Sequence, residues 1–344
     1  MDLPYAYGGA AGSGILKQAP DDFAVEEILG FAPSGEGEHV FLHVEKTGTN
    51  TDAIAARIAE FAQLPRMAVS YAGLKDRHAR TLQWFSVHLP GKQDPDWQTL
   101  NSPELHILKA CRHNRKLKTG TLKGNRFHLR IRQLEAEQSL LEQRLQQIAC
   151  NGVPNYFGPQ RFGHNGQNIE KAKALFDGSL ITRNRHLRGI YLSAARSLIF
   201  NCVLAERVRQ QNWNQALEGD AFTFPDSHSY FCDALTPELL TRVATLQIHP
   251  SGPLWGKGEL STQAAARTLE EAAARQEPEL CSGLERNGLE MARRALRINP
   301  GEFSWRLDEN GKDGKQLQVS FTLPAGAYAT TVLREALAFA TVFD

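Results

Sequence analysis

The feature that most constrains the fold is the division of the chain between two kinds of hydrophobic pattern. Near both ends, apolar and polar residues alternate with the period of two that is typical of a half-buried β-strand. Between them, from about 165 to 299, the sequence is rich in Ala and Leu and predicts mainly helices. A β-rich start, a helical middle and a β-rich end favour one split domain with an insertion over three consecutive domains.

Residues 1–14 are rich in Gly and Ala and predict a loop. The expected strands are 24–28, 39–45, 82–88, 126–132, 303–307 and 317–321, the last two joined by a turn at 310–314. The expected helices are 52–63, 136–150, 192–209, one that opens at Thr236, 262–275, 284–298 and a final helix entered from 323–335.

Composition excludes several classes of protein. The 344 residues leave room for two domains, and the net charge of +1 provides no overall basic field. Five cysteines, odd in number and without a C-x-x-C pair, argue against a disulfide framework and a zinc site. The N-terminus lacks the pattern of a signal peptide, and no apolar segment is long enough to span a membrane. These observations predict a cytoplasmic protein with no membrane partner.

One stretch, VSYAGLKDRHARTLQWFSVHL at 69–89, concentrates groups that chemistry can use. Asp76 stands between Lys75 and Arg77, just beyond a glycine turn at Gly73. The two cations would favour the ionised form of the aspartate. A fixed, ionised aspartate can serve as a nucleophile, a base or a metal ligand. On the residues alone, a surface turn whose charges are solvated is the simpler interpretation.

A second stretch, 109–132, contains no acidic residue. Its basic side chains are Lys109, Arg112, Arg115, Lys116, Lys118, Lys123, Arg126, Arg130 and Arg132. Such local segregation of charge predicts a phosphate-binding surface, with a solvated basic face as the alternative. Because 126–132 alternates as a strand, Arg126, His128, Arg130 and Arg132 are expected on one sheet face.

Several separated motifs resemble one known family. AGLKDRHARTLQWF is similar to the catalytic motif of the TruD family of tRNA pseudouridine synthases. Further resemblances to this family are LKQAPDDFAVEEI, LKGNRFHL, VPNYFGPQRFG, LSAARS and LPAGAYATTVLRE, which together cover nearly the full length. The resemblance implies an α+β pseudouridine-synthase fold, with a mixed, mainly antiparallel sheet flanked by helices and a helix-rich insertion domain. It implies a split catalytic domain at 1–150 and 300–344 and the family-specific insertion at 151–299.

The same resemblance assigns roles to single residues. It makes Asp76 the catalytic aspartate, places Phe23 beside the target nucleotide and places Asn125 where it can orient Asp76 or the nucleotide. Tyr328 stands where the family more familiarly has phenylalanine, and would stack on the base with Phe23. The remaining residues implied at the substrate are Lys17, which contacts RNA, and Lys75 and Arg77, which would keep Asp76 ionised or bind phosphates.

The expected partner is tRNA, bound by a monomer without an obligate protein partner. The expected RNA contacts are Arg115, Lys116, Lys118, Lys123, Arg126, Gln160 and Arg161. The substrate that the resemblance implies is uridine 13 in the D arm of tRNA.

Converting uridine to pseudouridine breaks the glycosidic N–C bond, turns the freed uracil and joins it again through carbon. No redox change or energy input is needed, which agrees with the lack of a dinucleotide fingerprint or P-loop in the sequence. We therefore expect no cofactor and no metal. Two alternatives stay open: an inactive RNA-binding or RNA-folding protein, and a metal-dependent hydrolase that uses Asp76, His78 and His88, whose spacing fits no known ligand pattern.

Overall fold

The computed structural model describes residues 3–225, 227, 229–309 and 314–342. Its backbone contacts group into two compact units. The sheet unit comprises 12–138, 300–326 and 337–344, and the helical unit comprises 1–11, 139–299 and 327–336. The family domain boundaries at 150 and 300 stay a prediction.

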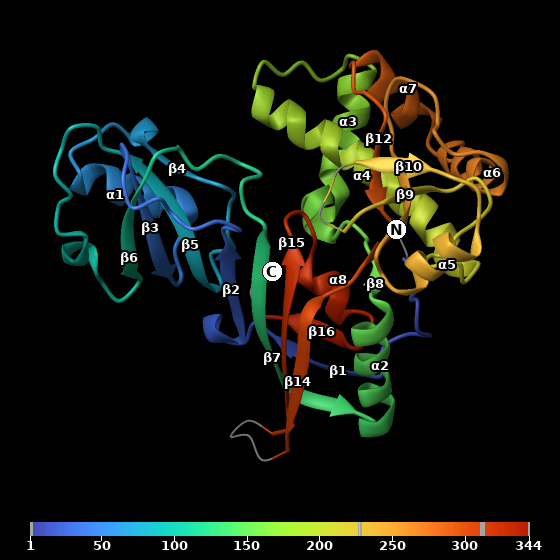
Figure 1. Cartoon of the computed structure of the whole chain (residues 1–344), viewed down its shortest axis with the longest axis horizontal. Helices are drawn as coiled ribbons and strands as arrows, with labels where there is room; N and C mark the ends of the chain where they lie inside the picture. Colours follow the sequence, from blue (N-terminus) through green and yellow to red (C-terminus); the bar gives the residue numbers. More distant parts are fainter. Residues whose placement is uncertain (1–2, 226, 228, 310–313, 343–344) are drawn as a thin grey trace. The chain divides into compact units, whose positions relative to one another are not determined.

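The sheet unit is built on a ten-stranded sheet (Figure 1). Its main path runs β14-β15-β7-β2-β5-β3-β6, with β4 beside β5 and β1 between β7 and β16. The strands are β1 (Gly12–Leu16), β2 (Phe23–Ile28), β3 (His39–Lys46), β4 (Val69–Tyr71), β5 (Arg80–His88), β6 (Leu105–His113), β7 (Gly124–Ala136), β14 (Gly301–Asp308), β15 (Gln316–Pro324) and β16 (Ala338–Thr341). Among the described residues of this sheet, only β2 with β5 and β1 with β16 pair in parallel, so the predicted mixed, mainly antiparallel sheet is confirmed.

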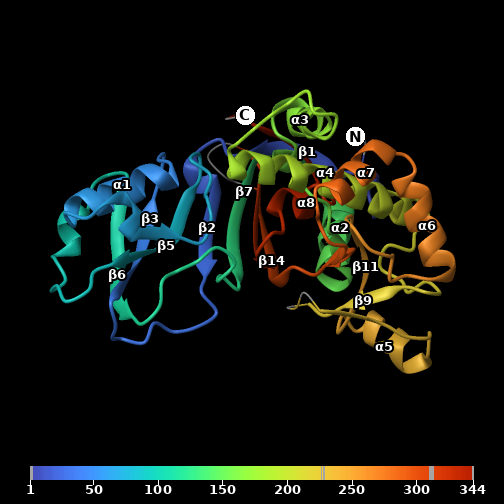
Figure 2. The same ribbon diagram turned by 90° about the horizontal axis from the view of Figure 1, so that it is seen from above.

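One helix, α1 (Thr51–Phe61), lies along β3, β5 and β6 in both views (Figures 1 and 2). Its apolar side chains Ile54 and Ile58 are fully buried against alternate residues of the strands. The strand residues in this core include Val40, Leu42, Val44, Phe85 and Val87. Short 3-10 turns complete the unit: η1 (Pro20–Asp22), η2 (Arg66–Ala68) and η3 (Trp97–Leu100). The alternation of β3 therefore buries one face beneath α1.

The segment LKGNRFHL begins a strand, although a bare Gly-Asn pair is typical of a turn. Gly124 opens β7 and pairs with Ile28 on one side and Pro324 on the other. A Cβ at Gly124 would lie 2.3 Å from the carbonyl oxygen of Leu323, so only glycine permits this close approach. The glycine thus sets the position of Asn125 in the sheet.

The predicted C-terminal hairpin is confirmed as β14 and β15, and residues 310–313 of its turn lie outside the described residues. Strands β1, β6 and β16 were missed, and the first residues of β1, from Gly12, lie in the segment predicted as a loop. In β6 only Leu105 and Ile107 follow a buried alternation, and a register shift interrupts its pairing with β3. β16 follows a final helix, α8 (Ala329–Leu333), that is shorter than expected.

The helical unit contains seven helices and two small sheets in the described residues. Its helices are α2 (Gln138–Asn151), whose first residue is assigned to the sheet unit, α3 (Gln167–Phe176), α4 (Arg185–Arg209), α5 (Pro237–Ala244), α6 (Ala264–Ala274), α7 (Pro278–Arg286) and α8. Two short 3-10 turns, η4 (Pro159–Phe162) and η5 (His164–Gly166), lie between α2 and α3. One sheet has the order β10-β9-β11-β12, from β9 (Ala221–Thr223), β10 (Tyr230–Cys232), β11 (His249–Leu254) and β12 (Ala292–Ala295). The other pairs β8 (Val153–Pro154) with β13 (Arg297–Ile298). Thr236 caps α5 through a hydrogen bond from the Leu239 amide, as predicted.

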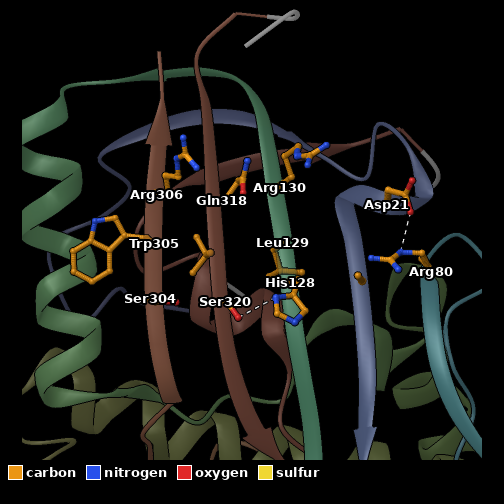
Figure 3. A pocket seen from close by; sticks show the side chains of 12 residues that line it. Asp21, Arg80, His128, Leu129, Arg130, Ser304, Trp305, Arg306, Gln318 and Ser320 are labelled. Atoms are coloured by element: carbon orange, nitrogen blue, oxygen red, sulfur yellow. Dashed lines mark hydrogen bonds and ion pairs between the residues drawn. The ribbon is translucent and has the colours of Figure 1, made fainter. Parts of the chain in front are cut away.

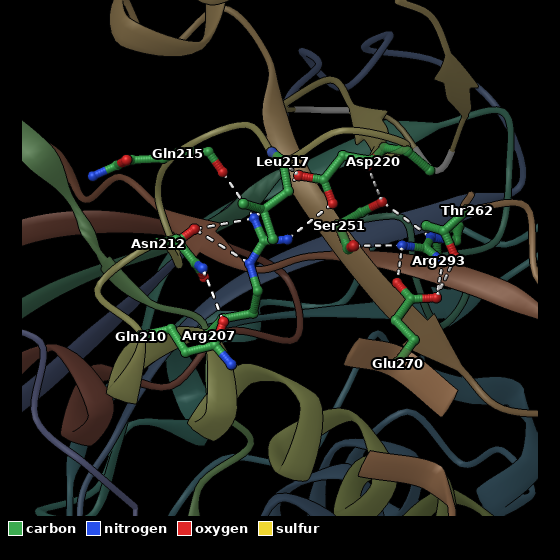
Figure 4. A network of polar contacts seen from close by, with 11 residues as sticks. Arg207, Gln210, Asn212, Gln215, Leu217, Asp220, Ser251, Thr262, Glu270 and Arg293 are labelled. Atoms are coloured by element: carbon green, nitrogen blue, oxygen red, sulfur yellow. Dashed lines mark hydrogen bonds and ion pairs between the residues drawn. The ribbon is translucent and has the colours of Figure 1, made fainter. Parts of the chain in front are cut away.

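The predicted helix at 284–298 is wrong. α7 ends at Arg286, Gly288 takes a left-handed φ of 73°, and 292–298 forms β12 and β13. Strand pairing sets Arg293 opposite Pro253, and its side chain donates to the Ser251 hydroxyl at 3.0 Å and to the carboxylate of Glu270 in the interior (Figure 4). A buried charge is tolerated only with such partners. Arg293 therefore serves the core.

A second buried ion pair stands in the same unit. Arg207, at the end of α4, donates to both carboxylate oxygens of Asp220 at 2.9 and 3.1 Å and to the carbonyl of Gln215 (Figure 4). Both charged side chains are almost completely buried. These contacts hold the turn after α4 against β9. No helix in the described part of the chain is long and apolar enough to cross a membrane.

Candidate functional site

The segment between β4 and β5 is held by buried polar groups. Gln83 of β5 donates to the carbonyl of Gly73 at 2.7 Å, and the Lys75 amide donates to the hydroxyl of Thr51 at 3.0 Å. Thr51 in turn donates to Gln83 at 3.1 Å, so β5 and the first turn of α1 share one network. The loop that carries Asp76 is therefore fixed from two sides.

Asp76 has its carboxylate hydrogen-bonded at both oxygens. Oδ2 lies 2.5 Å from Nζ of Lys17, and Oδ1 accepts the His78 amide at 2.9 Å. Burial tends to raise the pKa of the carboxyl, but the Lys17 and His78 hydrogen bonds and the charge of Lys17 outweigh it and leave the pKa below its ordinary value. Because 36% of the side chain stays exposed, an ionised carboxylate faces accessible space.

Lys17 takes an unusual conformation to reach Asp76. It follows β1 with a φ of 60°, a left-handed value that costs free energy for a residue with a Cβ. Its Nζ also stands 4.5 Å from the centre of the Phe23 ring. Phe23, the first residue of β2, is only 8% exposed. The structure thus brings together three of the predicted site residues: Asp76, Lys17 and Phe23.

A further lysine supports this loop and was missed from the sequence. Lys46 is fully buried at the end of β3, and its Nζ donates to the backbone carbonyls of Thr49 at 2.9 Å and Asp76 at 3.3 Å. Burial lowers its pKa from 10.5 to about 8. The sequence did carry a signal that Lys46 is buried, because it continues the alternation of Val40, Leu42 and Val44.

The expectation that Lys75 and Arg77 hold Asp76 ionised is wrong, because that contact is made by Lys17. Lys75 forms an ion pair with Glu27, which is buried in β2. Burial raises the pKa of Glu27, and the charge of Lys75 and its hydrogen bond oppose that effect. Arg77 donates to the carbonyl of Gly48 at 3.2 Å. Both cations instead anchor the backbone on either side of Asp76; their contact with substrate stays a prediction.

Asn125 stands in register with Glu27, on the sheet face that carries Phe23. Its Oδ1 is buried and accepts no hydrogen bond from the described residues. No bond to Asp76 is formed among them, so the role of Asn125 in orienting Asp76 or the nucleotide stays a prediction.

The predicted RNA contacts of the sheet unit fall into two groups. Arg115, Lys116, Lys118 and Lys123 are exposed on the β6–β7 connection and form no ion pair with a described residue. In contrast, Arg126 of β7 is held by Glu302 at 2.9 Å and Glu26 at 3.7 Å. The exposed cations of the connection are therefore the ones free to meet phosphates.

The remaining predicted residues belong to the helical unit. Arg161 of η4 donates from Nε to the Tyr328 hydroxyl at 3.1 Å and from a terminal nitrogen to Ser193. Phe157 packs edge-on to the Tyr328 ring, with centroids 6.3 Å apart. Gln160 is exposed beside them. The hydroxyl that distinguishes Tyr328 from phenylalanine thus positions Arg161.

Among the described residues, no three His, Cys, Asp or Glu side chains are grouped around one point, so these residues provide no ligand set for a hydrolytic metal centre. His88, one of the residues named for that alternative, stacks on His39 with ring centroids 4.8 Å apart.

Comparison with known proteins decides the family. Residues 3–178 and 167–336 match the family described as tRNA pseudouridine synthase D (TruD). The chain belongs to the TruD family. Two relatives named tRNA pseudouridine synthase D are similar over nearly their full length. The Methylococcus capsulatus protein is 50% identical over 98% of this chain and 95% of its own, and the Pseudomonas aeruginosa protein is 46% identical over 98% and 94%.

A solved structure agrees at the level of the fold. A candidate TruD from Methanosarcina mazei superimposes with a TM-score of 0.75, covering 97% of this chain and 98% of that chain at 22% identity. The TruD fold predicted from the sequence is therefore confirmed.

Proposed function

We propose that this TruD-family chain isomerises uridine to pseudouridine in tRNA, at uridine 13 of the D arm, with Asp76 as its catalytic carboxylate. The observation that carries this proposal is the state of Asp76. Its carboxylate is fixed by Lys17 and the His78 amide, kept ionised, and left partly exposed. Membership of the TruD family and the names of its relatives support the tRNA substrate.

The reaction needs a carboxylate beside the ribose and a surface that holds the detached base. Asp76 would act covalently at the sugar or the base, or assist removal of a ribose proton. Each of these roles needs the ionised form. Lys17 favours that form because it lowers the pKa of Asp76, and Lys46 and Lys75 hold the loop that presents the carboxylate.

Reaching a paired nucleotide requires that it leave the helix. Extrusion costs a few kcal/mol, and stacking on an aromatic side chain returns about 1–3 kcal/mol. Phe23 and Tyr328 are the proposed stacking residues. Because Phe23 is largely covered and carries Lys17 over its ring, base stacking there would involve a shift of the lysine side chain. Phosphate contacts from the exposed β6–β7 cations would supply the rest of the binding free energy.

The test is incubation of the purified protein, without added cofactor, with an unmodified tRNA transcript, followed by carbodiimide-stop mapping of pseudouridine. A transcript with cytidine at position 13 and the Asp76→Asn protein are the controls. We expect one stop at position 13 with the wild-type protein alone. Binding of tRNA without any stop would indicate an RNA-binding or RNA-folding protein, and a stop elsewhere would contradict the assigned target.

A further inference from the structure

A polar pocket of about 300 Å³ lies on the sheet unit, across β14, β15, β7, β2 and β5 (Figure 3). Two cross-strand rows form it. Arg306, Gln318 and Arg130 stand in register across β14, β15 and β7. The second row is Ser304, Ser320, His128, Ala24 and Arg80, which continues to β5. Ala24 has almost no side chain, which leaves space between His128 and Arg80.

The pocket opens on the face of the sheet opposite Phe23. Successive residues of a strand point to opposite faces, and directly paired residues share a face. Phe23 pairs with Leu129, whereas its neighbour Ala24 pairs with His128. Asn125 and Glu27 share the Phe23 face. The pocket is therefore separate from the proposed catalytic site.

Most charges on this face are already neutralised. Arg126 is bound by Glu302 and Glu26, and Arg132 donates to both oxygens of the buried Asp22 at 2.9 Å. Within the pocket, Arg80 contacts Asp21 at 2.9 Å, which is the only carboxylate of the lining, and also Glu45 at 3.3 Å.

Two guanidinium groups of the pocket are left without a close carboxylate. Arg306 is exposed and forms no ion pair or hydrogen bond with a described residue. Arg130 reaches Asp22 only at 3.9 Å, and its buried Nε has no hydrogen-bond partner among the described residues. A buried donor without a partner is unusual, since it loses the hydrogen bond that water would provide. It points to an acceptor that the pocket receives from outside.

Further polar groups line the pocket between and beside the two arginines. Gln318 lies between them in register, and the Ser320 hydroxyl meets Nδ1 of His128 at 3.0 Å (Figure 3). Two arginines flanking an amide, with hydroxyl and imidazole groups in the adjacent row, suit a tetrahedral oxyanion, because guanidinium groups donate in pairs to phosphate oxygens.

We propose that this pocket binds one phosphate group between Arg130 and Arg306. The phosphate comes either from a phosphodiester of tRNA, a source that rests on the proposed function, or from a free nucleotide. If the phosphate belongs to tRNA, the sheet contacts the substrate on both faces: at the proposed catalytic site and at this pocket on the opposite face. Both sources share the same recognition chemistry, and binding measurements distinguish them.

The test compares the wild-type protein with the Arg130→Gln/Arg306→Gln double variant and with Arg306→Gln alone. The single variant changes only an exposed side chain without a described partner, so it should fold even where the double variant does not. Lys92→Gln, an exposed lysine on a loop outside the pocket, is the matched control. Two probes are used: a labelled tRNA transcript followed by anisotropy across a salt series, and uridine 5′-monophosphate followed by the width of its ³¹P resonance.

For a tRNA phosphodiester, we expect the double variant to bind the transcript about tenfold more weakly at low salt, with a salt slope flatter by about 0.9, the value for one phosphate. The single variant should lie between, and Lys92→Gln should match the wild type. For a free nucleotide, tRNA affinity stays constant and only the wild type broadens the ³¹P resonance.

Equal behaviour of wild-type and variant proteins with both probes would overturn the proposal. Neither probe reports turnover. A wild-type protein that forms no pseudouridine would therefore refute the proposed function without affecting this result.

Discussion

The ammonium group of Lys17 lies 2.5 Å from the carboxylate of Asp76, although 59 residues separate the two along the chain. Lys17 takes a left-handed φ of 60° where it makes this contact. Such strain persists only where surrounding contacts over-determine the conformation. Here those contacts are the ion pair with Asp76 and the approach of the ammonium to the Phe23 ring. The lowered pKa of Asp76 therefore depends on a residue distant in sequence.

Replacing Asp76 with Asn should abolish pseudouridine formation while leaving tRNA binding within about threefold. The amide keeps the shape of the carboxylate but provides neither a nucleophile nor a base. Single-turnover rates and the tRNA dissociation constant measure the two effects separately. Asp52→Asn, which alters an exposed carboxylate bound to Arg66 and Tyr71, is the control and should stay active. Turnover by Asp76→Asn would contradict the assignment.

Replacing Lys17 with Gln should move the acid limb of the pH–rate profile to higher pH. Lys17 lowers the pKa of Asp76, so its removal raises that pKa and a larger fraction of the carboxyl is protonated at a given acidic pH. The rate at saturating tRNA should be measured from neutral pH down to below 3.8, the ordinary carboxyl pKa, because the limb of the wild type lies below that value. Arg77→Gln removes a neighbouring cation that donates to Gly48, and should leave the limb in place. An equal shift in both variants would show that Lys17 has no special role.

Lys46 should make the protein more stable as pH rises above 8. Its pKa is about 8 when folded and near 10.5 when unfolded, so between these values the unfolded chain binds more protons and unfolding costs more free energy as pH increases. At about 1.4 kcal/mol per pKa unit, the gain reaches about 3 kcal/mol. Urea unfolding at pH 7 and pH 10 of the wild type and Lys46→Met isolates this contribution, since the variant lacks the titrating group. The same pH dependence in both proteins would show that Lys46 is not the source.

Replacing Arg115, Lys116 and Lys118 together with Ala should weaken tRNA binding and flatten its salt dependence. A plot of log K against log salt has a negative slope, and each lost phosphate contact makes that slope less steep by about 0.9. These side chains are exposed, so the fold should be retained. A triple variant of the paired surface arginines Arg209, Arg267 and Arg275 is a charge-matched control. An unchanged slope in the first variant would place the RNA track elsewhere.

Replacing Tyr328 with Ala should lower the single-turnover rate strongly, whereas Tyr328→Phe should lower it by less than about tenfold. Phenylalanine keeps the ring, and with it base stacking, and loses only the hydrogen bond that Arg161 donates to the hydroxyl. Phe23→Ala should resemble Tyr328→Ala, with an added change in the acid limb because Lys17 loses the ring beneath it. Unchanged rates in both alanine variants would argue against base stacking at these positions.

Much of this protein was determined by its sequence. Alternation predicted β2, β3, most of β7 and the hairpin of β14 and β15, because strand period is a local property of the chain. The resemblance of AGLKDRHARTLQWF and the other motifs led to the TruD family, since a match at several separated segments is specific. The same resemblance singles out Asp76, Phe23 and Asn125.

The tertiary structure alone decided which charges meet. Lys75 stands next to Asp76 in sequence but pairs with Glu27, and Lys17 takes its place. The segment with Arg293 became a strand because pairing with β11 brings that arginine to Glu270. Arg130 and Arg306 share a pocket only through the register of β7, β15 and β14. Ion pairs depend on distances between strands that are remote in sequence, and periodicity carries no information about those distances.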